Sequence, residues 1–263
     1  MNSKPTLRDK ACLSYWFPKL VESNVLVPRT EIITTDVELW QLLEPNGVAP
    51  KNLDVFVREL LGAVDKIGGL PIFLRTGHLS GKHDWSRTCH VQIDPTNPQE
   101  DLSAILMRHV ASLVEWSEMV DIIGLPTKVW AVREFLPLLS PFTAYRDMPV
   151  AREFRLFIED GAIVCVHPYW PTKALEEGDP STKDWFDTYS RLMTLSNHED
   201  RALREVAWQV ADVFAGEGAW SLDLAQHQDG RWYAIDMAPA EISFHWAGCK
   251  SGEKWKGGRD GMG

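Results

Sequence analysis

The apolar positions of the chain follow two periods, and together they predict a mixed α+β protein. Apolar side chains three and four residues apart predict amphipathic helices at residues 53–67, 101–118 and 200–214. Short apolar or alternating runs predict strands at residues 71–75, 129–136, 151–158 and 162–167. The last two strands flank Glu159-Asp-Gly and so predict a hairpin, with Glu153 and Arg155 on one face and the apolar residues on the other.

A second hairpin, at residues 220–239, is the most informative stretch. Its two apolar arms are joined by Gln228-Asp-Gly-Arg, in which Asp229-Gly230 is a strong turn signal. Each arm contains one carboxylate, Asp223 or Asp236, at nearly equal distances from the turn, so we expect them to lie opposite each other. Two interpretations remain open: both carboxylates face water, or both bind a divalent cation such as Mg²⁺, which would offset the cost of burying them.

Composition and charge exclude several classes of protein. Of the 263 residues, 44% are hydrophobic and 24% are charged, as in ordinary globular proteins. The formal net charge of −10 argues against a nucleic-acid partner, because such proteins normally carry a basic face. No apolar run is long enough to span a membrane, and the polar N-terminus lacks a signal peptide. We therefore expect a cytoplasmic protein with no membrane partner.

The four cysteines are widely separated in the sequence. Cys12, Cys89, Cys165 and Cys249 form no Cys-x-x-Cys pair. This spacing argues against a zinc site and fits free thiols in a reducing cytoplasm.

A loop with the composition of a phosphate-binding segment follows the strand at 71–75. Residues 76–83 contain two glycines, two hydroxyls and Lys82, directly after Arg75. Glycine amides and these two cations would suit a polyphosphate. The spacing is not that of a Walker A loop, and a solvated loop is an equal alternative.

The order of these parts resembles the ATP-grasp superfamily. The matching motifs are Phe73-Leu-Arg-Thr-Gly with Ser80-Gly-Lys-His, Val132-Arg-Glu-Phe-Leu, Arg152-Glu-Phe-Arg-Leu-Phe-Ile, and Ser221-Leu-Asp-Leu-Ala with Tyr233-Ala-Ile-Asp-Met-Ala-Pro. The chain is most similar to the branch that contains cell division cycle protein 123 and to the phage and bacterial clade in which arginine replaces a nucleotide-binding lysine. The resemblance implies an α+β ATP-grasp fold, in which two α+β subdomains hold ATP between two antiparallel sheets.

On this resemblance, the chain divides into four parts. Residues 1–69 would form an N-terminal region, 70–130 the subdomain with the phosphate loop, 131–247 the subdomain with the adenine hinge and the metal-binding hairpin, and 248–263 a flexible tail.

The resemblance also implies roles for individual residues. Arg75 would touch the α- or β-phosphate, and Lys82 would close over the phosphates. Arg133 would be a second cation, although the sequence does not fix its face. Glu134, Phe135 and Leu136 would form the adenine hinge. Arg155 would bind the γ-phosphate or an acyl-phosphate intermediate and act with Lys82 in catalysis, while Asp223 and Asp236 would hold Mg²⁺.

One position departs from the family pattern. Family members usually carry a further Asn ligand two residues after the second carboxylate, and here that position is Ala238. Mg²⁺ would then need a water or phosphate oxygen in its place.

Two functions of different classes follow from the resemblance. The first is a Mg-ATP-dependent carboxylate–amine ligase that forms an amide or peptide-like bond through an acyl phosphate, from small-molecule or peptide substrates. The second is an ATP-binding assembly factor with little turnover and a protein partner, towards which Ala238 and the high tryptophan content lean. A histidine-dependent hydrolase has little support, because no Gly-x-Ser-x-Gly motif is present.

Overall fold

The computed structural model describes residues 5–45, 47, 49–120, 124–247 and 249–251. The chain forms two compact units, residues 28–136 and residues 1–27 with 137–263. These bounds differ from the division expected from the sequence, whose boundary at 130/131 would cut through a strand. The expected tail lies outside the described residues except for Cys249–Ser251.

The unit of residues 28–136 is a four-stranded antiparallel sheet with two long helices. Its elements are β1 (Thr30–Thr34), η1 (Leu39–Leu43), α3 (Leu53–Ile67), β2 (Ile72–Thr76), η2 (Lys82–Asp84), β3 (His90–Val91), α4 (Leu102–Met119) and β4 (Val129–Glu134). The strand order is β1-β4-β2-β3. Because β1 pairs along most of β4, residues 28–69 belong to this unit, whereas residues 1–27 belong to the other one.

The two helices that apolar periodicity predicts in this unit are both present. α3 has the predicted bounds, and α4 starts one residue later than predicted because Asp101 is its N-cap and accepts a 2.7 Å hydrogen bond from the Ser103 amide. α3 and α4 bury their apolar stripes with one face of the sheet, in a core that includes Phe56 and Trp130, whose ring centroids are 5.6 Å apart. Trp130 and Val132 of β4 therefore face the helices, and Ala131 and Arg133 lie on the other face of the sheet.

The second unit has a four-stranded antiparallel sheet of order β10-β9-β7-β8 and a strand pair β5-β6. Its elements are α1 (Leu7–Ala11), α2 (Leu13–Glu22), β5 (Thr143–Ala144), β6 (Met148–Pro149), β7 (Glu153–Glu159), β8 (Ala162–Pro168), α5 (Thr172–Glu177), α6 (Trp185–Leu192), α7 (Asn197–Val213), β9 (Ala219–Gln226), β10 (Trp232–Pro239) and η3 (Ala240–Ile242). Both predicted hairpins, β7-β8 and β9-β10, are confirmed.

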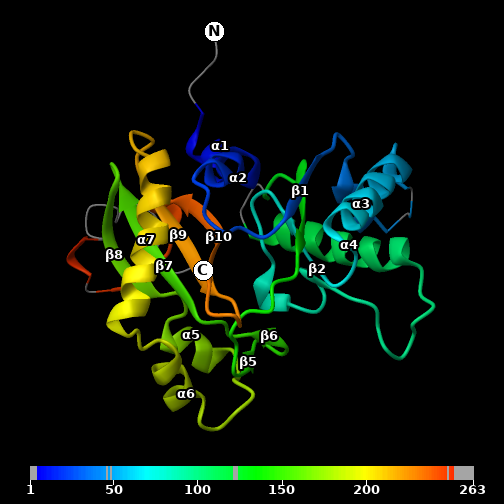
Figure 1. The fold of residues 1–263 in the computed structure, drawn as a ribbon. Helices are drawn as coiled ribbons and strands as arrows, with labels where there is room; N and C mark the ends of the chain where they lie inside the picture. Colours follow the sequence, from blue (N-terminus) through cyan, green and yellow to red (C-terminus); the bar gives the residue numbers. More distant parts are fainter. Residues whose placement is uncertain (1–4, 46, 48, 121–123, 248, 252–263) are drawn as a thin grey trace. The chain divides into compact units, whose positions relative to one another are not determined.

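α7 lies across this sheet and fixes which of its faces is covered (Figure 1). The helix starts three residues before the predicted Asp200, because Ser196 and Glu199 form a capping box at its N-terminus. Phe214, at its C-terminal end, packs against Trp220 of β9 with ring centroids 5.1 Å apart. Trp220 and Asp223 lie an odd number of residues apart on β9, so the Asp223 face is the one opposite α7.

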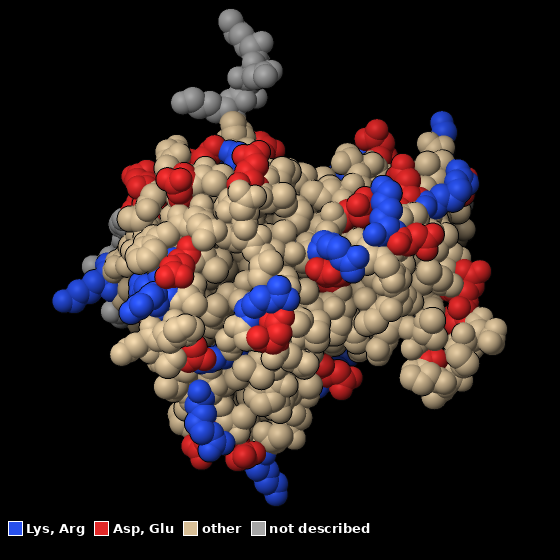
Figure 2. Space-filling view, in the orientation of Figure 1, with Lys and Arg blue, Asp and Glu red and all other residues tan. Residues whose placement is uncertain are grey.

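Charged side chains of both signs are mixed on the face of the molecule drawn in Figure 2. No continuous basic area is visible there among the described residues. None of the helices in the described part of the chain combines the length and apolarity needed to cross a bilayer.

Candidate functional site

A β-bulge brings the two aspartates of the hairpin together. In β10, Ala234 pairs with Leu224, but Asp236 pairs with Asp223, so Ile235 is an extra residue. In a regular hairpin Ile235 would stand opposite Asp223, and Asp236 would point to the α7 side of the sheet. The bulge reverses this alternation and places Asp236 on the Asp223 face. The predicted pairing of the two carboxylates is confirmed.

Arg155 of the neighbouring strand β7 forms a bidentate ion pair with Asp223. The two residues are register partners across β7 and β9, and Arg155 Nε and Nη2 donate to Asp223 Oδ1 and Oδ2 at 2.8 and 2.9 Å. Asp223 is almost fully buried, and the side chain of Arg155 is 15% exposed. Burial opposes the charged guanidinium, but the adjacent Asp223 carboxylate more than offsets it and raises the pKa of Arg155 above its ordinary value. The Arg155 guanidinium therefore stays charged in spite of its burial.

The surroundings hold Arg155 in a fixed orientation. Its guanidinium carbon lies 4.6 Å from the ring centroid of Tyr169, and its Nη1 donates to the Phe244 carbonyl oxygen at 3.5 Å. Asp236 lies beside the pair, and its Oδ1 accepts a 3.0 Å hydrogen bond from the Met237 amide. Three charged groups thus share one face of the sheet.

These groups fit a hard divalent cation. Two register-paired carboxylates supply the oxygen ligands that Mg²⁺ prefers, and an arginine fork beside them suits phosphate. Ala238 is the register partner of Ser221 on the same face, so its methyl group stands where the family pattern has an amide. The donor set is complete enough for Mg²⁺ only if water or phosphate supplies the remaining oxygens.

The structure resolves the face on which Arg133 lies. In the sheet of residues 28–136, Arg133 pairs with Phe73, and Arg75 pairs with Ala131. The two arginines therefore share the face away from α3 and α4, and both are buried. Arg133 Nε donates to Thr30 Oγ1 at 3.2 Å, and Arg75 Nε donates to the Thr76 carbonyl oxygen at 3.1 Å.

Aromatic rings that the sequence analysis did not single out lie beside these arginines. His90 is the register partner of Phe73, stacks on Trp85, and lies 4.6 Å from the centroid of Phe135. All four rings are partly exposed. Together with Phe135 they form one group of partly exposed rings. The ring contacts identify Trp85 and His90 as neighbours of Phe135, because neither Trp85 nor Phe135 lies on a strand.

One residue of the predicted adenine hinge, Glu134, already forms hydrogen bonds within the chain. Glu134 accepts hydrogen bonds from Arg29 N at 2.8 Å and Arg29 Nε at 2.7 Å, and its own amide donates to the Arg29 carbonyl oxygen. Glu134 therefore ties β4 to the start of β1. Leu136 is half-buried at the end of the unit.

The loop between β2 and β3 is built by its own hydrogen bonds rather than being a solvated loop. Thr76 Oγ1 accepts from the amides of His78 and Leu79 at 3.3 and 2.9 Å, and the Gly77 amide donates to the Val129 carbonyl oxygen at 2.7 Å. These three amides therefore already have acceptors within the chain. The expected use of glycine amides for phosphate finds no support at Gly77, and Lys82 lies half-buried in η2.

A protein-family model covers most of the chain. A family model described as ATP-grasp domain, R-to-K clade family 3, matches residues 65–255. A search of the curated proteins found no match.

Solved structures share the fold. C-terminally truncated Cdc123 from Schizosaccharomyces pombe superposes with a TM-score of 0.54 at 13% identity, over 90% of this chain and 88% of that one. Cdc123 from the same organism gives 0.50 at 14% identity, with the same coverage. The ADP complex of purK, an N5-carboxyaminoimidazole ribonucleotide synthetase, gives 0.47 at 8% identity, over 88% of this chain and 45% of that one. For the two Cdc123 structures, identities of 13% and 14% mean that the likeness extends to the fold and not to the activity.

Proposed function

The chain belongs to the ATP-grasp domains, R-to-K clade family 3, and from this premise we propose that it is a Mg-ATP-dependent carboxylate–amine ligase. The observation that supports the proposal is the convergence of Arg155, Asp223 and Asp236 on one face of the β10-β9-β7-β8 sheet. Such a site needs no protein nucleophile, because phosphoryl transfer depends on positioning and on stabilising the charge that develops.

Each residue of the site has a defined task in this reaction. Asp223 and Asp236 would hold Mg²⁺, which when bound would neutralise phosphate charge. Arg155 keeps its orientation through Asp223 and Tyr169 and has N–H donors beyond the two that Asp223 accepts, so it would bind the transferred phosphoryl group. A substrate carboxylate would attack the γ-phosphorus, ADP would leave, and an amine would displace phosphate from the acyl phosphate.

The unit of residues 28–136 contains candidate nucleotide-binding groups of its own. Arg75 and Arg133 place two cations on one sheet face, and Lys82 adds a third from the loop. Phe135, with the aromatic rings beside it, offers a stacking surface for adenine. These assignments can be tested separately from the metal site.

Ala238 favours a second candidate function, an ATP-binding assembly factor with little turnover. With a methyl group in place of an amide oxygen, the metal site would bind Mg-ATP but would hold the metal less firmly during the reaction. Such a protein would bind the nucleotide with one partner protein and release little ADP.

Binding and turnover measurements separate these functions. Titration calorimetry with Mg²⁺ and a non-hydrolysable ATP analogue should show binding that Asp236→Asn weakens about tenfold or more, equivalent to about 1.4 kcal/mol. Asp187→Asn, an exposed position on α6, is the matched control and should bind like the wild type. If Asp223→Asn and Asp236→Asn both bind normally, the metal assignment is wrong. ADP release that rises on adding carboxylate and amine mixtures would support the ligase; tight binding without such release would support the assembly factor.

A further inference from the structure

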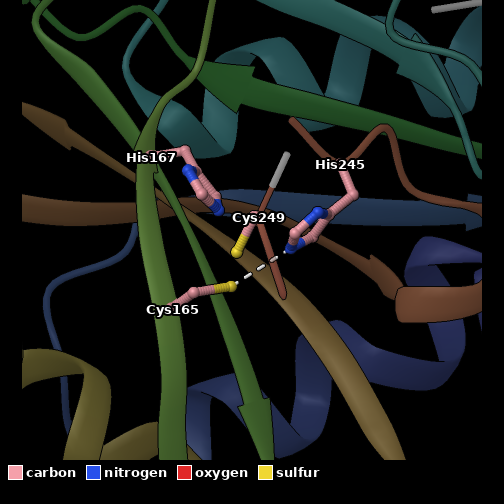
Figure 3. Close-up of side chains that lie close together, drawn as sticks. All are labelled: Cys165, His167, His245 and Cys249. Atoms are coloured by element: carbon pink, nitrogen blue, oxygen red, sulfur yellow. Dashed lines mark hydrogen bonds between the residues drawn. The ribbon is translucent and has the colours of Figure 1, made fainter. Parts of the chain in front are cut away.

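Two cysteines and two histidines that are distant in the sequence meet at one side of the β10-β9-β7-β8 sheet. Cys165 and His167 lie on β8, and His245 and Cys249 lie on the segment after η3. One potential ligand atom from each of the four lies within 4.8 Å of those of the other three. Figure 3 shows the four side chains converging. We refer to these four residues as the Cys/His cluster. All four are half-buried.

Strand alternation and one hydrogen bond bring the cluster together. Cys165 and His167 are two residues apart on β8, so their side chains leave the same face of the sheet. His167 is the register partner of Arg155, which identifies this as the Asp223 face. The segment after η3 returns to β8, where Trp246 Nε1 donates to the Pro168 carbonyl oxygen at 2.9 Å.

The hydrogen bonds of the cluster leave nitrogen lone pairs directed inward. His245 Nδ1 lies 3.3 Å from the Trp246 carbonyl oxygen, a contact that requires the hydrogen to be on Nδ1 and leaves Nε2 as the basic nitrogen. That Nε2 lies 3.2 Å from Cys165 Sγ. His167 Nε2 is buried and has no hydrogen-bond partner among the described residues. A buried nitrogen without a partner is costly unless something binds it.

We propose that the Cys/His cluster binds a Zn²⁺ ion through two thiolates and two imidazole nitrogens. Two sulfur and two nitrogen ligands are the donor set of tetrahedral zinc and are poor ligands for Mg²⁺ or Ca²⁺. Zinc–ligand bonds of about 2.0–2.3 Å place tetrahedral ligand atoms roughly 3.3–3.8 Å apart. Ligand atoms within 4.8 Å of one another reach this geometry through side-chain movements of about 1 Å.

The ion would have a structural role beside the nucleotide site. Two thiolates neutralise Zn²⁺, so the occupied cluster adds no net charge to a half-buried position. The ion would link β8 to the segment that contains Phe244, whose carbonyl oxygen accepts from Arg155. The sequence analysis argued against zinc from cysteine spacing alone. The sequence does contain a signal for a metal site, because two of the cysteines each have a histidine nearby. These pairs are Cys-x-His at 165–167 and His-x-x-x-Cys at 245–249.

Metal analysis of the full-length chain tests this proposal without nucleotide. The wild type, incubated with Zn²⁺ and dialysed, should retain one Zn²⁺ per chain by plasma mass spectrometry. Cys249→Ser and His167→Ala should lose it. Cys12→Ser and His198→Ala are the matched controls, because Cys12 is not in the cluster and His198 is exposed on α7, and both should retain the ion.

A spectroscopic measurement on the wild type covers the case in which the variants fail to fold. Co²⁺ added to the metal-free protein should give the intense visible bands of a tetrahedral site and the ultraviolet charge-transfer band of thiolate ligands, and Zn²⁺ should abolish both. Absence of bound Zn²⁺ and of these bands would overturn the proposal, as would a Cys165–Cys249 disulfide in protein purified under reducing conditions. Loss of Mg-ATP binding alone would leave this result unchanged.

Discussion

The ion pair between Arg155 and Asp223 should be among the most strongly coupled pairs in the protein. Its two hydrogen bonds measure 2.8 and 2.9 Å, and Asp223 has almost no solvent exposure. With charge centres about 4 Å apart and an effective dielectric constant of about 20, the attraction is about 4 kcal/mol. Removing one partner also leaves the other charge buried, so Asp223→Asn or Arg155→Met should each lower the free energy of unfolding by about 3–5 kcal/mol.

A double-mutant cycle measures this coupling directly. The variant with both substitutions has no unpaired charge and loses mainly hydrogen bonds, so it should be destabilised by only about 1–3 kcal/mol. The coupling energy should therefore be about 3 kcal/mol or more. Urea denaturation at pH 7, followed by tryptophan fluorescence, gives the four free energies of unfolding.

An exposed ion pair provides the control. Arg58 and Asp54 on α3 are joined by a 2.8 Å contact, but both side chains are more than half exposed. Asp54→Asn should leave the urea midpoint unchanged, because solvent screens such a pair. If the effects of Asp223→Asn and Arg155→Met add to within about 0.5 kcal/mol, the two groups are independent and the reasoning from burial fails.

Three further predictions concern the same unit. Deleting Ile235 removes the bulge but keeps Asp236 opposite Asp223, so Mg-ATP affinity should fall less than for Asp236→Asn in calorimetry; an equal loss would show that the bulge itself is needed. Ala238→Asn should tighten Mg²⁺ binding about fivefold, equivalent to about 1 kcal/mol, by restoring an oxygen ligand, and unchanged affinity would refute the idea that a ligand is missing at this position. Hydrogen bonds from Arg152 and Ser196 lower the pKa of Glu199 to about 2 from 4.5. The contribution of the ionised Glu199 carboxylate to the free energy of unfolding is therefore complete above pH 4.5 and is lost as the pH falls to 2. The melting temperature of Glu199→Gln should therefore change less with pH over that range.

Local sequence determined the elements and several of their ends. The helix at residues 53–67 has its predicted bounds, because both its apolar spacing and its Gly68 stop are encoded within a few residues. The hairpin at residues 220–239 follows in the same way from its alternation and from the turn at Asp229-Gly230. The family motifs added the order of parts, and the match over residues 65–255 confirms the ATP-grasp assignment.

Pairing between segments that are distant in the sequence determined which residues are neighbours in space. The face of Arg133 depends on its register with Phe73, and the face of Asp236 depends on the inserted residue Ile235. The Cys/His cluster joins positions 165 and 249, which no local pattern relates. Periodicity encodes the side of a strand on which a residue lies only while the strand stays regular. Strand register, bulges and the return of a segment to a distant strand are set by tertiary packing. These features bring together both the carboxylate pair and the proposed zinc site.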